Sequence, residues 1–534
     1  QLLPKEMPIS CINRSVGKEP VDMAFASIKG RSKWAIPWLE DDPALTQPQL
    51  WVERMRRDAT DALSYGCDGL MGIHWRTRSV WPNLFSLSKA AWDQSYGSPE
   101  DIGWQPVGGN LAGYGSPIEG TNEPEIYQTV RWGLSAYRLS LPNGSYRVIL
   151  KFSELAYDKP GNRVFDVLLN GKTVIEELDI FAKVGKNHAY DAAFPVEVTD
   201  GVLKVGFNAR LEYPCIAAIV VEGEGRTWEV NCAGSAINGY DADGLSDPKY
   251  PTKDLYLEWC AIEFGSDVAI PMSEMFAKLD GRLPRPIGWT DGPGGLRPDE
   301  RSWKDVRKEY GFVAYMESLA TKVQRAGAKE RFNYWLSGFQ YLRAVGELRC
   351  VWSEYNKATS LEQRLEIRHR MVLMLERIYR ELLEQVSTTG ELGTIANWEQ
   401  HILPGLLEAP GKALEKELGK PLPADLLLRK AYVGPLRVVV PTVRTMVRRG
   451  QPLRIVARLL SSSAIRSMEL KVRSMGKGGY RSIPFNHIAR GVYRVELTPK
   501  DDIEYFIECT NARREKAMFP VTAPTQGQTV IVAP

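Results

Sequence analysis

The stretch GCDGLMGIHWRTR, residues Gly66–Arg78, carries the clearest fold signal in the chain. Its first half, Cys67–Ile73, is a short apolar run interrupted by Gly69 and Gly72. The run is too short for a helix and has no alternating polar face, which is typical of a strand buried on both faces of a parallel sheet. The segment therefore predicts an α/β architecture organised around this strand.

Polar and aromatic side chains gather at the carboxyl end of this strand. They are His74, Trp75, Arg76 and Arg78. In parallel α/β folds the loops at that end bind ligands. An imidazole, an indole and a guanidinium group suit a polyhydroxylated or anionic ligand, so His74, Trp75 and Arg76 are predicted to bind substrate. The alternative is that the two rings cover the core while the arginines are solvated.

A second buried strand, Trp34–Trp38, comes earlier, and a helix predicted from Gln47 to about Ser64 joins the two. Pro48 stands in the first turn of that helix, where the N–H that proline lacks would have no partner in any case. Strand, helix and strand in this order form the βαβ pattern, whose crossover is right-handed. Both strands should therefore end at the same edge of the sheet.

Three carboxylates follow the end of the earlier strand: Glu40, Asp41 and Asp42. Glycoside hydrolysis normally uses two carboxyl groups, one as general acid and the other as nucleophile or base. These acids are therefore the candidate catalytic residues, and Trp38 joins the polar group of the other strand in lining a sugar subsite. The alternative is that the acids cap the following loop or pair with Arg54 or Arg57.

The composition is that of an ordinary globular protein. The chain has 534 residues, of which 44% are hydrophobic and 25% are charged, and a chain of this length should hold roughly three to five domains. Because 68 basic residues face 65 acidic ones, the small net charge gives no electrostatic case for binding nucleic acid. No apolar run is long enough to span a bilayer.

The cysteines and short motifs indicate neither a metal site nor a cofactor. The 7 cysteines are scattered, with no zinc-ligand spacing and no sign of a disulfide framework. Phosphate-binding, zinc-protease and α/β-hydrolase motifs are also missing. The chain begins at Gln1, so we expect a mature product or a piece of a longer protein, and a secreted or periplasmic location.

From Trp104 to about Glu222 the sequence predicts a β-sandwich. Short alternating or apolar runs are separated by the turn signals Pro142-Asn143-Gly144, Asn170-Gly171 and Asp200-Gly201. Several strands at a spacing of roughly 8 to 12 residues are typical of such a fold.

Within this region stand four ordered motifs, GTNEPEIYQTVRWG, YRLSLPNGSYRVILKFSE, RVFDVLLNGKTVIEELDI and IAAIVVEG. They resemble the malectin family of carbohydrate-binding β-sandwich domains. The resemblance implies that the domain binds a glycan on loops at one edge, with contacts from Tyr127, Arg131 and Tyr157. Tyr157 stands further from Glu154 than the matching aromatic residue does in many relatives. The alternative for Arg131 is a pairing with a carboxylate inside the sandwich.

Beyond the sandwich the α/β pattern returns, with helices predicted over Asp254–Gly265 and Val268–Leu279. The sandwich is therefore interpreted as an insertion, which is tolerated because the ends of a domain usually lie close together. The strands and the returning helices resemble the last units of a (β/α)8 glycoside hydrolase barrel. Such a barrel needs eight strands, so we expect the missing ones to come from an upstream segment or another chain, with a homo-oligomer as one form of the latter.

The rest of the chain changes character twice. Helical periodicity predicts a small bundle from the segments Trp303–Val323, Lys329–Tyr355 and Leu361–Val386. Thr388–His401 is then predicted to be a glycine-punctuated loop whose Glu391 and His401 touch a substrate. From about Pro435 onward, alternating runs between turns resemble an immunoglobulin-like accessory sandwich.

These inferences predict a multidomain α+β protein. Its parts are a partial (β/α) barrel region (1–92), a malectin-like β-sandwich (93–225), returning helices and a linker (226–300), a helical bundle (301–430) and an immunoglobulin-like β-sandwich (431–534). The predicted function is a glycoside hydrolase that degrades a polysaccharide or other glycan and carries a glycan-binding domain. The alternative, which the missing strands favour, is a non-catalytic glycan-binding or scaffolding protein.

Overall fold

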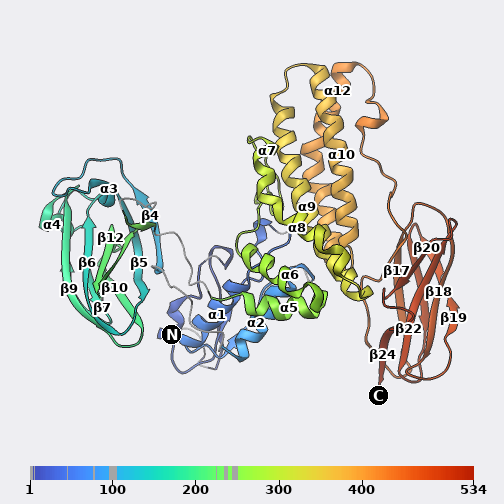
Figure 1. Ribbon diagram of the computed structural model, residues 1–534, viewed down its shortest axis with the longest axis horizontal. Helices are drawn as coiled ribbons and strands as arrows, with labels where there is room; N and C mark the ends of the chain where they lie inside the picture. The colour runs from blue at the N-terminus through green and yellow to red at the C-terminus, as the bar shows by residue number, and fades with distance from the viewer. Residues whose placement is uncertain are drawn as a thin grey trace. The chain divides into compact units, whose positions relative to one another are not determined.

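The computed structural model describes residues 4, 6–17, 19–44, 46–75, 78–94, 105–223, 225–233, 239–242 and 250–534. The chain forms two compact units (Figure 1), one from Asp93–Pro251 and the other from Gln1–Trp92 together with Thr252–Pro534. The second unit is therefore discontinuous in sequence, because the first interrupts it.

A parallel sheet begins the discontinuous unit. Its order is β1 (Ile9–Ile12), β2 (Lys33–Ile36) and β3 (Gly69–Leu70). A parallel bridge between Trp38 and Ile73 extends the pairing of β2 and β3. Helix α1 (Val52–Ser64) connects these two strands, which confirms the predicted βαβ unit. The predicted start of this helix is wrong, because the helix begins at Val52 and Pro48 lies before it rather than in its first turn.

Close packing explains the glycines that interrupt the apolar run. A Cβ atom on Gly69 would lie 2.8 Å from a ring carbon of Trp34, and one on Gly72 would lie 3.0 Å from a methyl carbon of Leu39. Real Cβ atoms essentially never come as close as the first of these distances. Glycine therefore lets β3 lie directly against β2 and its following loop.

The expectation that this strand is buried on both faces is wrong. β3 is short and only half-buried, and Met71 beyond it is exposed. Since β1 and β3 are the edge strands of a 3-stranded sheet in the described residues, no second neighbour covers them. A closed barrel pairs every strand on both sides, and no such barrel is evident in the described part of the chain.

Helices α2 (Trp81–Trp92), α5 (Lys253–Phe264) and α6 (Ser266–Leu279) belong to the same unit as the sheet. Arg56 of α1 donates two hydrogen bonds to the carboxylate of Asp254 in α5, at 2.8 and 2.7 Å. Lys89 of α2 forms an ion pair with Glu258 of α5. The chain that follows the interruption thus packs on the helices that precede it.

The buried carboxylate of Asp280, directly after α6, fixes the start of α1. It accepts the backbone N–H groups of Val52 and Glu53 at 2.8 and 3.0 Å, and the hydroxyl of Tyr256 at 2.7 Å. The first turn of a helix leaves such N–H groups without partners. Asp280 therefore supplies a cap from a distant part of the sequence.

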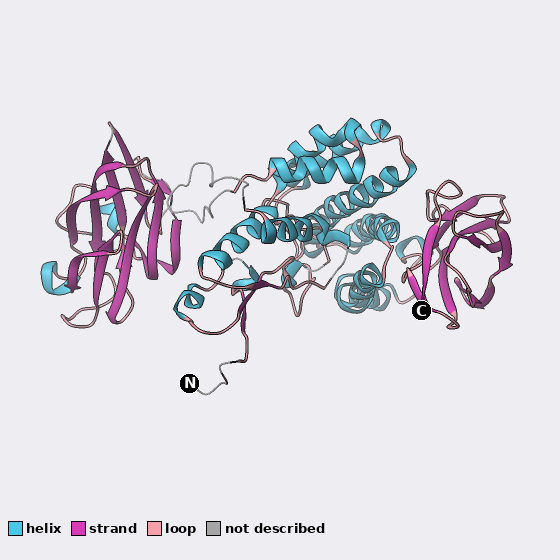
Figure 2. Ribbon diagram, turned by 90° about the horizontal axis from the view of Figure 1, so that it is seen from below, coloured by secondary structure: helices cyan, strands magenta, loops and turns pink. Residues whose placement is uncertain are grey.

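The unit formed by Asp93–Pro251 is a β-sandwich, with its strands in magenta in Figure 2. One sheet has the order β11 (Cys215–Ile216), β5 (Thr129–Ser140), β10 (Val202–Leu211), β7 (Val164–Leu169) and β8 (Lys172–Leu178), with β4 (Gln105–Gly113) beside β5. The other has the order β14 (Asp241–Ala242), β13 (Arg226–Asn231), β12 (Ala218–Gly223), β6 (Gly144–Ser153) and β9 (Ala189–Val198). β13 and β14 continue this sheet past residue 225.

The core of the sandwich lies between the two sheets. Alternate residues of β7 are fully buried, including Phe165 and Val167, because successive side chains of a strand point to opposite faces. Phe152 of β6 meets Phe165 with 6.2 Å between ring centres. Two short helices, α3 (Pro124–Tyr127) and α4 (Ile180–Val184), complete the unit.

The predicted bundle contains two long helices, α9 (Ala326–Lys357) and α10 (Leu361–Gln385), which lie side by side (Figure 1). The predicted helix over Trp303–Val323 is broken into α7 (Trp303–Val306), a 3-10 turn η5 (Arg307–Tyr310) and α8 (Gly311–Leu319). The aromatic stripe of α9 is core, as expected. Trp335 meets Trp259 of α5 edge to face, with 5.5 Å between ring centres.

The prediction of a loop over Thr388–His401 is wrong. The segment forms α11 (Thr389–Asn397) and a π-helix, η7 (Trp398–Ile402), followed by a second π-helix, η8 (Pro404–Glu408), and α12 (Ala409–Leu418). Thr388 and Glu391 form a reciprocal capping box at its start. Trp398 and Ile402 are buried in the bundle core. Their burial stabilises a helix although Gly390 and Gly393 disfavour one.

The C-terminal part consists of two β-sheets. One has the order β15 (Arg437–Val439), β17 (Leu453–Leu460), β21 (Val492–Leu497) and β20 (Asn486–Ala489). The other has the order β16 (Met446–Arg448), β24 (Gln528–Ala533), β22 (Ile503–Asn511), β18 (Ile465–Ser474) and β19 (Arg481–Pro484), with β23 (Lys516–Phe519) beside β22. The immunoglobulin-like assignment stays a prediction.

Among the helices of the described ranges, none combines the length and apolar character needed to cross a membrane.

Candidate functional site

A cleft of about 570 Å³ opens in the sandwich among β4, the ends of β5 and β6, and the loops that follow β6 and β10. Its walls are formed by Leu111, Ala112, Tyr114, Val130, Trp132, Ser153, Glu154, Leu155, Ala156, Tyr157, Arg163, Glu212, Tyr213 and Cys215. Strands hold one side of the cleft in place, while the loops that carry Tyr157 and Tyr213 form the other.

Aromatic rings dominate this cleft. They belong to Tyr114, Trp132, Tyr157 and Tyr213. Tyr213 is 56% exposed, and its ring centre lies 5.6 Å from that of Trp132, with the two planes tilted by 57°. Exposed aromatic faces can stack on the apolar faces of sugar rings, and a tyrosine hydroxyl adds a hydrogen-bonding group at the same place. The cleft thus offers apolar and polar contacts together.

A buried ion pair holds the loops of the cleft. Glu154 and Arg163 are only 1% and 9% exposed, and Arg163 Nε donates to Glu154 Oε2 at 2.8 Å. The other oxygen of Glu154 accepts the backbone N–H of Tyr157 at 3.1 Å. Arg163 also donates to the backbone carbonyl of Tyr213, and its guanidinium carbon lies 5.0 Å from the centre of the Tyr157 ring. One ion pair therefore positions two of the four aromatic residues.

The surroundings shift the pKa values of Arg163, Tyr157 and Cys215 in the cleft. Burial disfavours a charged Arg163, yet the neighbouring Cys215 and Glu154 raise its pKa above the usual value, so it stays charged. Burial and, after it, the charge of Glu212 raise the pKa of Tyr157, which keeps its phenol neutral. Burial also raises the pKa of the Cys215 thiol to about 12, so the thiol is not a nucleophile at neutral pH.

Comparison with known proteins assigns this unit to a family. Residues 94–222 match the family model described as the malectin domain. This segment is a malectin domain. Over 104 residues it is 36% identical to malectin of Homo sapiens and 35% identical to malectin-B of Xenopus laevis. Each match covers 18% of this chain, and 36% and 38% of the two relatives, so the chain spans little more than a third of the length of these two curated relatives.

Among solved structures, a beta-glucuronidase of Bacteroides uniformis aligns with 22% of this chain and 14% of its own, at 21% identity and a TM-score of 0.22. The ANXUR1 extracellular domain of Arabidopsis thaliana aligns with 21% of this chain and 38% of its own, at 17% identity and a TM-score of 0.20.

The structure separates the three residues predicted to contact glycan in the malectin domain. Tyr157 lines the cleft, whereas Tyr127 and Arg131 are buried and do not line it. The hydroxyl of Tyr127 donates to Asp191 at 2.6 Å, and Arg131 Nε donates to the hydroxyl of Tyr137 at 3.1 Å. Arg131 thus makes a contact inside the sandwich, whereas the partner of Tyr127, Asp191, has a side chain that is 44% exposed.

Sequence reasoning missed Tyr114, Trp132, Arg163 and Tyr213. Trp132 and Arg163 stand within the quoted motifs, but nothing in the pattern of a single sequence shows which face of a strand points into a cleft. Tyr114 and Tyr213 lie on connections far apart in sequence. An exposed aromatic residue beside a turn was the one available signal.

In the discontinuous unit, the two strand ends meet as the parallel pairing predicts. Glu40 is fully buried and accepts the backbone N–H of Trp75. Asp42 is half-buried and accepts the indole N–H of Trp75 at 2.6 Å. The side chain of His74 is exposed beside them, and Arg76 lies outside the described residues. Glu40, Asp42 and Trp75 thus form one cluster at the carboxyl end of the sheet.

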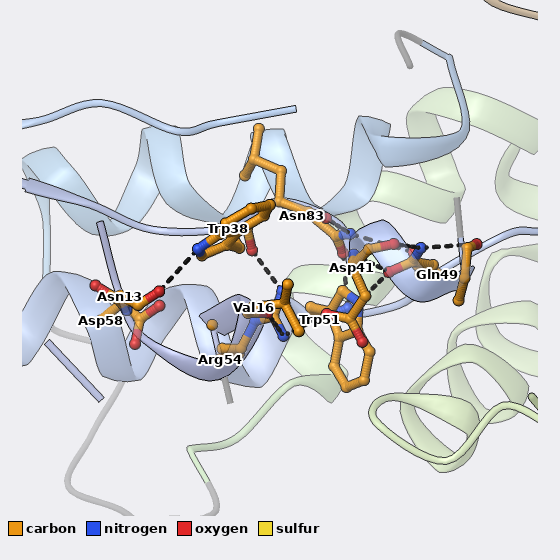
Figure 3. A network of polar contacts seen from close by, with 12 residues as sticks. Asn13, Val16, Trp38, Asp41, Gln49, Trp51, Arg54, Asp58 and Asn83 are labelled. Atoms are coloured by element: carbon orange, nitrogen blue, oxygen red, sulfur yellow. Dashed lines mark hydrogen bonds and ion pairs between the residues drawn. The ribbon is translucent and has the colours of Figure 1, made fainter. Parts of the chain in front are cut away.

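Asp41 belongs to a buried polar network instead (Figure 3). Its side chain is fully buried and forms ion pairs with Arg285 and, at 3.1 Å, with Arg54. Arg54 also donates to the carbonyl of Trp38 at 2.6 Å, and its guanidinium carbon lies 4.4 Å from the centre of the Trp51 ring. Burial lowers the pKa of Arg54, and the charge of Asp41 opposes that shift. The alternative interpretation, a pairing with Arg54, therefore holds for Asp41.

The remaining predicted substrate contacts have structural partners. The half-buried Trp38 donates its indole N–H to the carbonyl of Asn13 at 2.8 Å (Figure 3). Glu391 is buried and caps α11. His401 Nε2 lies 2.9 Å from the carbonyl oxygen of Thr290. Thr290 belongs to a turn in which the backbone N–H of Gly294 donates to the carbonyl of Pro43. His401 is therefore linked to the strand-end segment through this turn.

Proposed function

We propose that this is a glycan-binding protein, and that its malectin domain binds a neutral oligosaccharide in the aromatic cleft. The observation that supports this most is the convergence of Tyr114, Trp132, Tyr157 and Tyr213 on one cleft. The family resemblance of the segment adds to it. Concave sites with apolar walls and a few fixed polar groups are typical of small-ligand binding.

The charges in the cleft favour an uncharged sugar. The positive charge of Arg163 is balanced by Glu154 at 2.8 Å, and both groups are committed to holding the loops. The carboxylate of Glu212 is exposed at the rim. It would accept hydrogen bonds from sugar hydroxyl groups and repel an acidic sugar. Neutral glycans are therefore the proposed ligands, and a secreted or periplasmic location would bring the protein to them.

The experiment is a glycan array probed with the full chain and with Tyr213→Ala. We expect the wild type to bind neutral oligosaccharides, and the variant to bind them about fivefold more weakly, since one stacked aromatic ring contributes about 1 kcal/mol. Tyr315→Ala is the matched control, because Tyr315 is a similarly exposed tyrosine on α8, outside the malectin domain. Equal binding by both variants, or no binding by the wild type, would exclude the cleft as a glycan site.

A second candidate function is glycoside hydrolysis at the carboxyl ends of β2 and β3. The meeting of Glu40, Asp42 and Trp75 favours it, because glycoside hydrolysis normally uses a pair of carboxyl groups and an exposed indole beside them could stack on a sugar ring. Asp42 is the acid of this cluster that is not fully buried, so we assign it the role of the general acid or base. In this proposal the strands that would complete a barrel come from an upstream segment, another chain or a homo-oligomer.

A further inference from the structure

An elongated pocket of about 1010 Å³ runs along one side of α10 in the helical region. Its other walls include residues of η7, η8 and α12 and the segment from Leu427 to Val433. Two successive π-helices are rare, and such segments occur often at functional sites. Pro404 has no N–H to donate to the preceding turn, which accounts for the interruption of regular α-helix there. The wider turns contribute Glu399, Leu407 and Glu408 to the pocket wall.

The distinctive group in this pocket is Arg368. Its side chain is only 3% exposed, and its two hydrogen bonds go to backbone carbonyls, those of Leu426 at 3.1 Å and Leu407 at 2.9 Å. Across the described residues, no carboxylate lies within ion-pair distance of it. A Cβ atom on Gly411 would lie 2.8 Å from Arg368 Nη2, so glycine in α12 makes room for the guanidinium group.

A bound anion would stabilise the buried positive charge of Arg368. Burial lowers its pKa, against the weaker opposing influence of Tyr355 and Glu415. Glu415 accepts the backbone N–H of Leu422 at 3.1 Å and does not form an ion pair with Arg368. The comparably buried Arg54 pairs with Asp41 at 3.1 Å. A buried cation without a counter-ion is costly, so a ligand anion placed here would be strongly favoured.

The apolar part of the pocket wall indicates the chemical character of the rest of the ligand. Leucines line the pocket at positions 383, 403, 407, 422, 427 and 428. Because an α-helix rises about 1.5 Å per residue, the side of α10 between Arg368 and Leu383 measures about 22 Å. That length suits an extended aliphatic chain with its charged end at Arg368.

We propose that this pocket binds an aliphatic monocarboxylate, with the carboxylate on Arg368 and the chain along the leucines. A planar carboxylate matches the part of the guanidinium fork that the two carbonyls leave open. The other charged groups of the pocket wall balance one another, with Arg380, Lys412, Arg429 and Lys430 against Glu376, Glu399, Glu408 and Glu415. A singly charged carboxylate therefore matches the one remaining positive charge, that of Arg368, better than a phosphate dianion does. Glu376 is already paired with Arg429 at 3.1 Å.

The test is isothermal titration calorimetry of the full chain with octanoate, 1-octanol and inorganic phosphate. We expect octanoate to bind. 1-Octanol should bind at least about tenfold more weakly because its hydroxyl lacks the charge that pairs with Arg368, and phosphate should bind at least about tenfold more weakly because it leaves the leucines of the pocket uncovered. Equal affinity for octanoate and 1-octanol would overturn the role of Arg368. Equal affinity for octanoate and phosphate would overturn the apolar half of the proposal.

Variants locate the site. Arg368→Gln should weaken octanoate binding at least about tenfold, whereas the control Arg370→Gln should leave it unchanged, because Arg370 is an exposed residue of the same helix paired with Glu354. Leu427→Glu provides a test that does not depend on removing a buried group. Leu427 is 45% exposed, so the variant should fold and should place its own carboxylate in the pocket, which excludes octanoate. Unchanged octanoate affinity in Leu427→Glu, with a normal melting temperature, would contradict the proposal.

Discussion

Replacing Arg163 with alanine is expected to lower the free energy of unfolding of the malectin domain by about 3–5 kcal/mol and to abolish glycan binding. The substitution leaves the carboxylate of Glu154 buried without its cation. It also removes the donor that holds the backbone carbonyl of Tyr213. Hydrogen exchange of the β6 and β12 amides in the full chain measures the opening free energy of this domain separately from the rest.

Arg210→Ala is the matched control for this prediction. Arg210 of β10 forms ion pairs with Asp166, Glu176 and Glu177 in the same domain, but its side chain is 38% exposed. Exposed pairs contribute little, so we expect Arg210→Ala to lower the free energy of unfolding much less than Arg163→Ala does. If Arg163→Ala were no more destabilising than Arg210→Ala, the Glu154–Arg163 pair would not be the support of the cleft.

Asp42→Asn is expected to reduce the turnover of a glycoside by at least about a hundredfold if the strand-end cluster is catalytic. The change preserves the shape of the side chain and its contact with the Trp75 indole, while it removes the acid–base group. The measurement is release of reducing sugar from neutral polysaccharides by the full chain. Normal melting of the variant establishes that the loss is chemical.

The hydrolysis test has its own control and its own contrary results. Asp267→Asn changes an exposed acid on α6 and should leave turnover as it is. Full activity in Asp42→Asn and also in Glu40→Gln and His74→Ala would place catalysis elsewhere. Absence of hydrolysis by the wild type would leave glycan binding as the sole proposed function of the two.

The sequence predicts elements well where local pattern and packing agree. Trp34–Trp38, the helix after Pro48 and the glycine-containing strand form the expected βαβ unit, because each element has a hydrophobic period and a clear stop signal. The strands 453–460 and 492–497 of the C-terminal part match β17 and β21. The predicted burial of β3 fails, since burial depends on neighbours that a local pattern does not contain.

The cleft proposed as the glycan site was harder to predict for the same reason. The YQTVR motif directed attention to Tyr127 and Arg131, but both are turned into the sandwich, and the cleft is built by side chains from β4, β5 and two distant loops. At the strand ends, proximity in sequence grouped Glu40, Asp41 and Asp42 together. The structure divides them, because successive residues point in different directions and only Asp41 meets Arg54 and Arg285.

The central claim, that glycan binds in the aromatic cleft of the malectin domain, is tested most directly by hydrogen–deuterium exchange of the full chain with and without its best array ligand. We predict slower exchange in peptides that cover Tyr114, Trp132, Tyr157 and Tyr213, and unchanged exchange around Asp42 and Trp75. Slower exchange confined to the strand-end cluster, with the cleft peptides unchanged, would contradict the account.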